Sequence, residues 1–207
     1  MKIYDVSVQL SADLPTYPGD PKISFEQSSS ISKGDPANVT RIDMGSHTGT
    51  HIDAPYHFID DGPKLDQLKL EIMMGRTHVL QVTAPVINES VLEEFDFTDK
   101  TRVLFKTRNS YLWDRGPEFV KDYVYIEPSA AELLVREGIK LVGIDYLSVE
   151  KFGSTKFETH LEFLRNDIVI LEGLNLKEVE PGDYDMVCLP MRLASGDGAP
   201  ARVILRK

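Results

Sequence analysis

Three of the five histidines lie in one short segment, His47-Thr48-Gly49-Thr50-His51-Ile52-Asp53-Ala54-Pro55-Tyr56-His57. Its histidines and its aspartate all occupy odd-numbered positions, so an extended chain would point them toward one face. An undistorted strand would still separate the two ends by about 33 Å. Ligands of one metal ion must each lie within roughly 2.0–2.2 Å of it. The segment must therefore curl, and Gly49 and Pro55 suit such a bend.

Imidazoles and a carboxylate at this spacing favour a borderline divalent ion. The number of imidazoles favours zinc, with manganese or iron as the alternatives. A continuous helix would also bring His47 and His51 together, but Gly49 and Pro55 argue against a helix. The other interpretation is that these residues are ordinary polar loop residues with no shared function. That interpretation suits any one of them taken alone, but it does not explain the spacing of the whole group.

The composition favours one globular domain spanning residues 1–207, because 207 residues with 42% hydrophobic content can bury a substantial core. No repeat, low-complexity tract or linker divides the sequence. The net charge of −10 would repel a polyanion, which argues against nucleic acid as a partner. The single cysteine, Cys188, excludes a disulfide framework and a cysteine-based zinc site. Its apolar surroundings, Tyr184–Leu189, predict a buried strand.

The apolar runs, such as Ile168–Leu171, are far shorter than the roughly 20 residues needed to span a bilayer. The N-terminal residues lack the apolar stretch and cleavage site of a secretion signal. We therefore expect a cytoplasmic protein that does not enter the membrane.

Alternating and apolar segments predict more strand than helix. The expected strands are Lys2–Leu10, Ile23–Ser28, Asn38–Met44, Thr77–Val82, Arg102–Lys106, Leu141–Asp145, Ile168–Leu171, Tyr184–Leu189 and Ala201–Leu205. A turn is expected over Pro15–Pro21. Strands and helices interleave, which predicts an α/β fold with a mixed sheet or small barrel flanked by helices.

Helices are placed by their capping residues. Ser129 and Glu132 form a capping box before an apolar run, and Gly138 stands where a C-terminal cap belongs. Asn88 is a candidate cap for Glu89–Phe95. Two further segments, Leu65–Met74 and Phe157–Arg165, have roughly helical spacing.

The pattern H-x-G-T-H-x-D-x-P-x-H is similar to the signature of the cyclase family of metal-dependent hydrolases, whose best-known members are bacterial kynurenine formamidases. The resemblance extends over nearly the whole chain, and its further matches are Tyr17–Asp20, Gly143–Ser148, His160, Leu171–Leu174 and Gly198–Arg202. It implies a fold of the swivelling β/β/α type. It also implies a homodimer or homotetramer with the active site near a subunit contact.

The resemblance further implies a centre of two divalent metal ions. Its ligands would be His47, His51 and Asp53 for the first ion and His160 for the second, with Glu172 and Asp53 near both. Without the resemblance, His160 is interpreted as a partly buried helix residue and Glu172 as the polar end of a strand. His78 matches no family position and is assigned a structural role.

The implied reaction is hydrolysis of a carbon–nitrogen amide bond in a small aryl-linked substrate, with N-formylkynurenine as the first candidate. Metal-activated hydroxide would be the nucleophile and His57 the proton-transfer residue. Consistent with this, the sequence contains no G-x-S-x-G nucleophile elbow. Tyr17 occupies a substrate-binding position that is usually tryptophan in kynurenine formamidases, which leaves the aryl group open. The alternatives are an isatin-type cyclic amide hydrolase, a metal-dependent cyclase or dehydratase, and a non-catalytic binding module.

Overall fold

Eight strands form one sheet, and two more form a separate hairpin. The computed structural model describes residues 1–207. The sheet contains β1 (Ile3–Asp5), β4 (His51–Asp53), β5 (Met74–Gln81), β6 (Arg102–Lys106), β7 (Leu141–Ile144), β8 (Val169–Glu172), β9 (Gly182–Pro190) and β10 (Gly198–Arg206). The hairpin consists of β2 (Ser24–Ser29) and β3 (Val39–Asp43). The α-helices are α1 (Glu89–Leu92), α2 (Pro128–Arg136) and α3 (Glu158–Arg165). Short 3-10 segments are η1 (Ile31–Lys33), η2 (Pro55–His57), η3 (Leu65–Gln67), η4 (Leu70–Ile72) and η5 (Arg108–Arg115).

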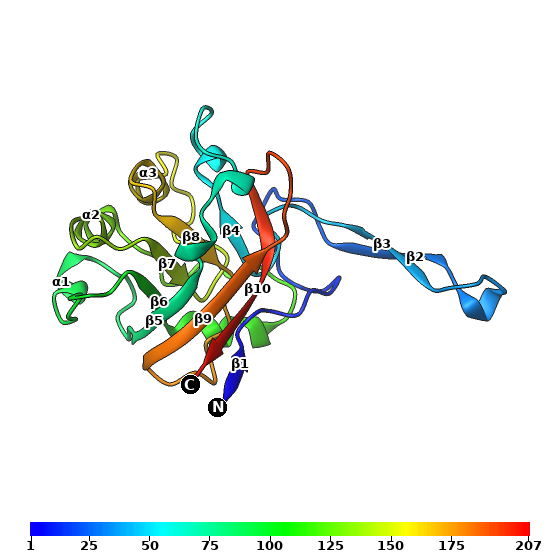
Figure 1. Ribbon diagram of the computed structural model, residues 1–207, viewed down its shortest axis with the longest axis horizontal. Coiled ribbons are helices and arrows are strands. Elements are labelled where there is room, and N and C mark those ends of the chain that lie inside the picture. Colours follow the sequence, from blue (N-terminus) through cyan, green and yellow to red (C-terminus); the bar gives the residue numbers. More distant parts are fainter.

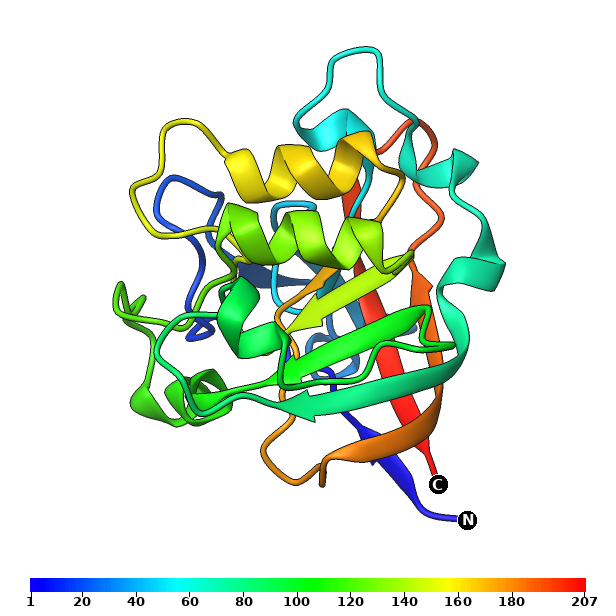
Figure 2. The same cartoon turned by 90° about the vertical axis from the view of Figure 1, so that its left-hand side faces the viewer.

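The sheet closes on itself. Its strand order is β1-β10-β4-β8-β7-β6-β5-β9, and β9 also pairs with β10, so all strands except β1 belong to a closed ring. The pairs β5–β6, β6–β7 and β7–β8 are parallel, whereas the others are antiparallel. The three α-helices lie side by side on one outer face (Figure 2). The predicted α/β fold with a mixed sheet or small barrel and flanking helices is confirmed.

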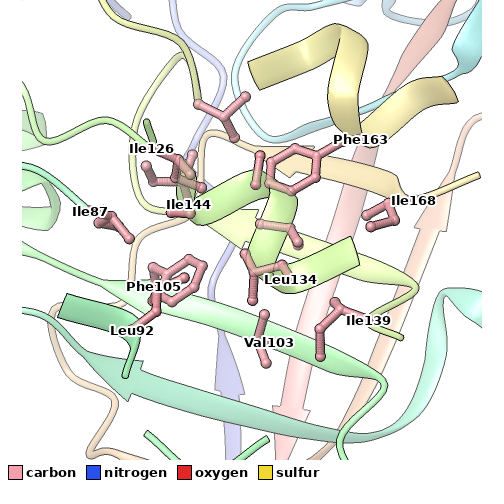
Figure 3. Packing of buried hydrophobic residues seen from close by; sticks show 14 of the residues in the cluster. Ile87, Leu92, Val103, Phe105, Ile126, Leu134, Ile139, Ile144, Phe163 and Ile168 are labelled. Carbon is pink, nitrogen blue, oxygen red and sulfur yellow. The ribbon is translucent and has the colours of Figure 1, made fainter. Parts of the chain in front are cut away.

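Alternation along the strands produces two apolar clusters. Leu104, Leu171 and Val203 belong to one cluster of 19 buried residues, to which most strands of the ring contribute. The next residue after Leu104, Phe105, points the other way and joins a cluster of 20 buried residues with Phe163 of α3 (Figure 3). Because successive side chains point to opposite faces, the first cluster fills the barrel and the second fixes the helices to its outside.

The cap of α2 differs from the predicted capping box. The helix begins at Pro128 with Glu127 as its N-cap, and the Ser129 hydroxyl lies 3.4 Å from the Glu89 amide instead. Proline fills the first helical position because its φ is preset and it has no N–H to satisfy. Gly138 ends the helix with a φ of +76°, as predicted.

The predicted helix over Leu65–Met74 is wrong. The segment forms η3 and η4, and β5 then begins at Met74. Its spaced apolar residues Leu65 and Met73 are buried against the barrel cluster, so single turns satisfy the pattern without a continuous helix. The helix capped by Asn88 is also shorter than predicted and ends at Leu92.

The N-terminal strand is shorter than predicted. Only β1, Ile3–Asp5, pairs with β10, and Ser7 adds an isolated bridge to Leu174. Beyond the bridge the chain leaves the sheet and leads to the turn at Tyr17.

The β2–β3 hairpin projects from the barrel as an arm (Figure 1). Phe25 and Ile42 lie opposite each other across the two strands and are 42% and 55% exposed. The arm connects the segment that contains Tyr17 to the segment that begins at His47. None of the helices combines the length and apolarity that crossing a bilayer requires.

Candidate metal centre

The pairing of β4 with β8 brings together residues that are far apart in the sequence. His51 lies directly opposite Glu172 in the antiparallel register, and its Nε2 is 3.3 Å from Glu172 Oε2. Ile52 points into the barrel, so His51 and Asp53 point outward toward α3. His51 Nε2 is also 3.3 Å from Asp53 Oδ1. The strand register thus builds a buried cluster of one imidazole and two carboxylates.

Two glycines allow β4 and β8 to approach at this point. Gly49 and Gly173 both have positive φ, at +65° and +73°. A Cβ on Gly173 would lie 2.0 Å from the carbonyl oxygen of Gly49, so no larger residue fits there. The Thr50 hydroxyl donates to the Gly173 carbonyl at 2.5 Å, which holds the two turns together.

His47 and His57 flank the cluster from the two ends of the curled segment. His47 precedes β4 in a turn, and its Nδ1 lies 2.8 Å from Asp53 Oδ1. His57 ends the 3-10 turn η2, which begins at Pro55. Its ring stacks on that of His47 with centroids 3.8 Å apart. Gly49 and Pro55 therefore bend the chain on either side of a very short strand.

The first turn of α3 places His160 next to the carboxylates of Asp53 and Glu172. Its Nε2 lies 3.4 Å from Glu172 Oε1 and 3.7 Å from Asp53 Oδ2. Its other ring nitrogen, Nδ1, is 3.1 Å from Glu150 Oε2, and that same oxygen accepts a hydrogen bond from the His160 amide at 3.3 Å. Glu150 therefore fixes the ring with Nε2 directed at the two other carboxylates.

These donors fit a divalent cation. His51 Nε2 and Asp53 Oδ2 are buried and have no hydrogen-bond partner, which normally carries a free-energy cost. Ligand atoms of His51, Asp53 and Glu172 lie within 4.8 Å of one another, as do those of His47, Asp53 and His57. Asp53 belongs to both groups, so the structure contains clusters that can hold metal. The second grouping includes His57, which is the predicted proton-transfer residue and not one of the predicted ligands.

The same neighbours change the pKa values of the buried imidazoles. Burial lowers the pKa of His51, but the neighbouring carboxylates of Asp53 and Glu172 outweigh this effect and raise the value to about 10. Burial also lowers the pKa of His160, but Glu150 and Glu172 outweigh this effect and raise the value to about 10. Without a metal ion, protons on these rings therefore balance the carboxylate charges.

A cavity of about 220 Å³ opens onto the cluster. Its wall includes the four histidines His47, His51, His57 and His160 and the carboxylate of Glu172, together with Tyr17, Asp20, Phe58, Leu147, Ser148, Glu150 and Phe157. Tyr17 is half-buried and packs edge-on against Phe119, with ring centroids 5.2 Å apart. An aromatic wall thus lies beside the polar cluster, and Tyr17 is part of it.

Comparison with known proteins agrees with the sequence signature. A family model described as putative cyclase matches residues 4–151. A kynurenine formamidase from Geobacillus thermodenitrificans (strain NG80-2) is 38% identical over 204 residues, which cover 98% of this chain and 96% of that protein. The chain belongs to the cyclase family.

Solved structures support this assignment. A protein described as a potential metal-dependent hydrolase with cyclase activity has a TM-score of 0.85 and 33% identity, covering 99% of this chain and 96% of its own. Isatin hydrolase A from Labrenzia aggregata has a TM-score of 0.83 at 20% identity, covering 99% and 93%, and so shares the fold. The resemblance found in the sequence is confirmed, and this member of the cyclase family is a hydrolase.

The structure also adds residues to this cyclase-family site that the signature does not contain. Glu150 contacts His160, Asp197 lies beside His47 and His57, and Phe58 and Phe157 line the cavity. No local pattern marks Glu150 and Asp197, because each reaches its histidine through a tertiary contact. His78, assigned a structural role from the sequence, lies in β5 and contacts Asp183, outside the cavity.

Proposed function

We propose that this hydrolase cleaves the carbon–nitrogen amide bond of a small aryl-linked substrate, with N-formylkynurenine giving kynurenine and formate as the first candidate. The observation that carries the proposal is the buried His51–Asp53–Glu172 cluster, with two unpartnered polar atoms, at the base of a cavity. The relative that is 38% identical over nearly the whole chain, named a kynurenine formamidase, favours the formamide over an isatin-type cyclic amide.

The proposed cofactor is two divalent ions per chain, zinc in the first instance, with manganese or iron as alternatives. His47, His51 and Asp53 would hold the first ion and His160 the second. The carboxylates of Glu172 and Asp53 each lie near His51 and near His160, which suits them to contact both ions. When bound, such ions act as Lewis acids and make water acidic enough to be a nucleophile near pH 7.

His57 is the proposed proton-transfer residue. Burial lowers the pKa of its ring below the ordinary value of 6.5, so the imidazole is neutral at pH 7 and can accept a proton. Its side chain is 29% exposed and lines the cavity, where a substrate can reach it. Transfer of that proton to the leaving nitrogen would complete hydrolysis, and such transfer is typically worth about 10²–10⁴ in rate.

Tyr17 is the proposed contact for the aryl group. Its ring packs between the cavity and the aromatic side chains of Phe119 and Phe152, with centroids 5.2 and 6.0 Å away. These neighbours hold the ring in place, so that it can stack on an aromatic substrate with little loss of side-chain freedom.

A homodimer or homotetramer is the proposed assembly. The projecting arm supports it, because an isolated two-stranded hairpin is at best marginally stable in water. Phe25 and Ile42 leave an apolar pair on the arm exposed, and a second copy of the chain is the proposed cover.

The first test is an activity assay with product analysis. Purified protein with added zinc or manganese should release formate from N-formylkynurenine. The His57→Ala variant should bind metal as the wild type does but lose about 10²–10⁴ in rate. His78→Gln is the matched control, since His78 lies outside the cavity, and it should keep the wild-type rate. An equally active His57→Ala variant would remove His57 from the mechanism.

The products distinguish the other functions. Hydrolysis of isatin but not of the formamide would select the cyclic amide substrate. A product lighter than its substrate by one water would indicate a cyclase or dehydratase. Normal metal binding without turnover of any aryl amide would leave a binding module.

A further inference from the structure

Asp197 lies beside the metal-centre histidines although it is 150 residues away from His47 in the sequence. Its Oδ2 is 3.0 Å from His47 Nε2 and accepts a hydrogen bond from the Ser46 hydroxyl at 3.2 Å. The same oxygen is 3.9 Å from His57 Nδ1. One carboxylate oxygen therefore faces both histidines that flank the buried cluster.

The backbone around Asp197 is attached to the metal-binding segment. The Ala54 amide donates to the Asp197 carbonyl at 2.9 Å, and Gly198 pairs with Asp53 at the start of β10. The Leu65 amide donates to the preceding carbonyl, of Gly196, at 2.9 Å. Although the Asp197 side chain is 43% exposed, its position relative to Asp53 is thus set by main-chain bonds.

The next residue shapes the same loop around the His47 ring. A Cβ on Gly198 would lie 2.6 Å from His47 Cε1. Only glycine allows the ring to rest against this backbone. The His47 ring is therefore held against the Gly198 backbone, with Asp53 beside Nδ1 and Asp197 beside Nε2.

We propose that Asp197 is a positioning residue that holds the His47 ring for metal binding and, through the stacked rings, sets the place of His57. The inference rests on the proposed function, because it presumes a metal at this cluster. A ligating histidine commonly gives its second ring N–H to a carboxylate, which fixes its tautomer and orientation. Here Asp197 faces Nε2 of His47, which leaves Nδ1, on the side of Asp53, as the nitrogen for the metal ion. The His57 ring stacks on the same imidazole, with ring centroids 3.8 Å apart.

Zinc affinity is the direct measurement. Metal-free protein would be titrated with zinc in competition with a chromophoric chelator. Asp197→Ala should weaken binding by about 10–100-fold, the usual effect of removing such a partner. Asp197→Asn should lose less, because its amide oxygen can still accept a hydrogen bond. Asp183→Asn is the matched control: it is also a half-exposed aspartate that contacts a histidine, His78, outside the site, so zinc binding should stay at the wild-type value.

A second readout separates positioning from folding. Urea midpoints should match the wild type, and at saturating zinc kcat should fall while KM is unchanged, because His57 rather than substrate contact is disturbed. If Asp197→Ala fails to fold, the isosteric Asp197→Asn carries the test. The inference would be overturned if the wild type binds zinc and both Asp197 variants bind it with an affinity within about twofold of the wild-type value, because the expected loss is about 10–100-fold. A wild-type chain that binds no metal would instead overturn the proposed function.

Discussion

The contact between Gly173 and Gly49 provides a sharp test of how the site is built. Glu172 ends β8, and the chain can continue past Gly49 only because Gly173 has no side chain. The perturbation is Gly173→Ala. Gly153→Ala is the matched control, since Gly153 has a similar φ of +81° but nothing within 4 Å of its would-be Cβ.

The two substitutions differ in magnitude for a physical reason. Alanine at positive φ costs roughly 1–2 kcal/mol, and this is the whole expected loss of unfolding free energy for Gly153→Ala. Gly173→Ala adds overpacking, because its Cβ would lie 2.0 Å from the Gly49 carbonyl oxygen, and strains the hydrogen bond from Thr50. These effects bring the expected loss to roughly 3–6 kcal/mol.

Urea unfolding of both variants measures the difference, and a chelator-competition titration reports whether zinc binding is lost as well. We expect Gly173→Ala to lose zinc affinity, because relief of the clash moves Glu172 away from His51. Unfolding free energies that agree within about 0.5 kcal/mol, the usual error of such comparisons, would refute the close approach as the determinant of this site.

Three other outcomes follow from burial and charge. The pKa values of His51 and His160 are raised to about 10, so both rings are protonated at pH 7, and the pKa of His47 is raised as well. Zinc binding should therefore release at least two protons per chain and tighten as the pH rises toward 10. Calorimetry in buffers of different ionisation enthalpy measures this release, and a value near zero would contradict the charge balance. Cys188 is buried with its thiol pKa raised to about 12 by burial, so a maleimide at pH 8 should label only unfolded protein, and rapid native labelling would show that the barrel opens. Replacing Phe25 and Ile42 by serine should convert the proposed oligomer to a monomer in light scattering, whereas an unchanged mass would place the interface elsewhere.

Local sequence patterns predict those features that neighbouring residues specify, such as the burial pattern of a strand or the end of a helix. The alternation around Cys188 and the glycine after α2 are patterns of neighbouring residues, and the predicted strand and helix end are both found in the structure. The helix expected over Leu65–Met74 fails because spaced apolar residues say which side chains are buried but not what covers them. There the barrel provides the cover, and single turns suffice.

The sequence by itself determined the family and the chemical types of the candidate ligands, because the His47–His57 segment places three imidazoles and a carboxylate within reach through backbone bends that glycine and proline encode locally. Only the tertiary structure decided that Glu172 faces His51, that α3 places His160 beside Glu172, and that Asp197 contacts His47. These contacts depend on strand register and on the closure of the barrel. Register is set by burial of one face along all the strands together, so no single segment of the sequence contains it.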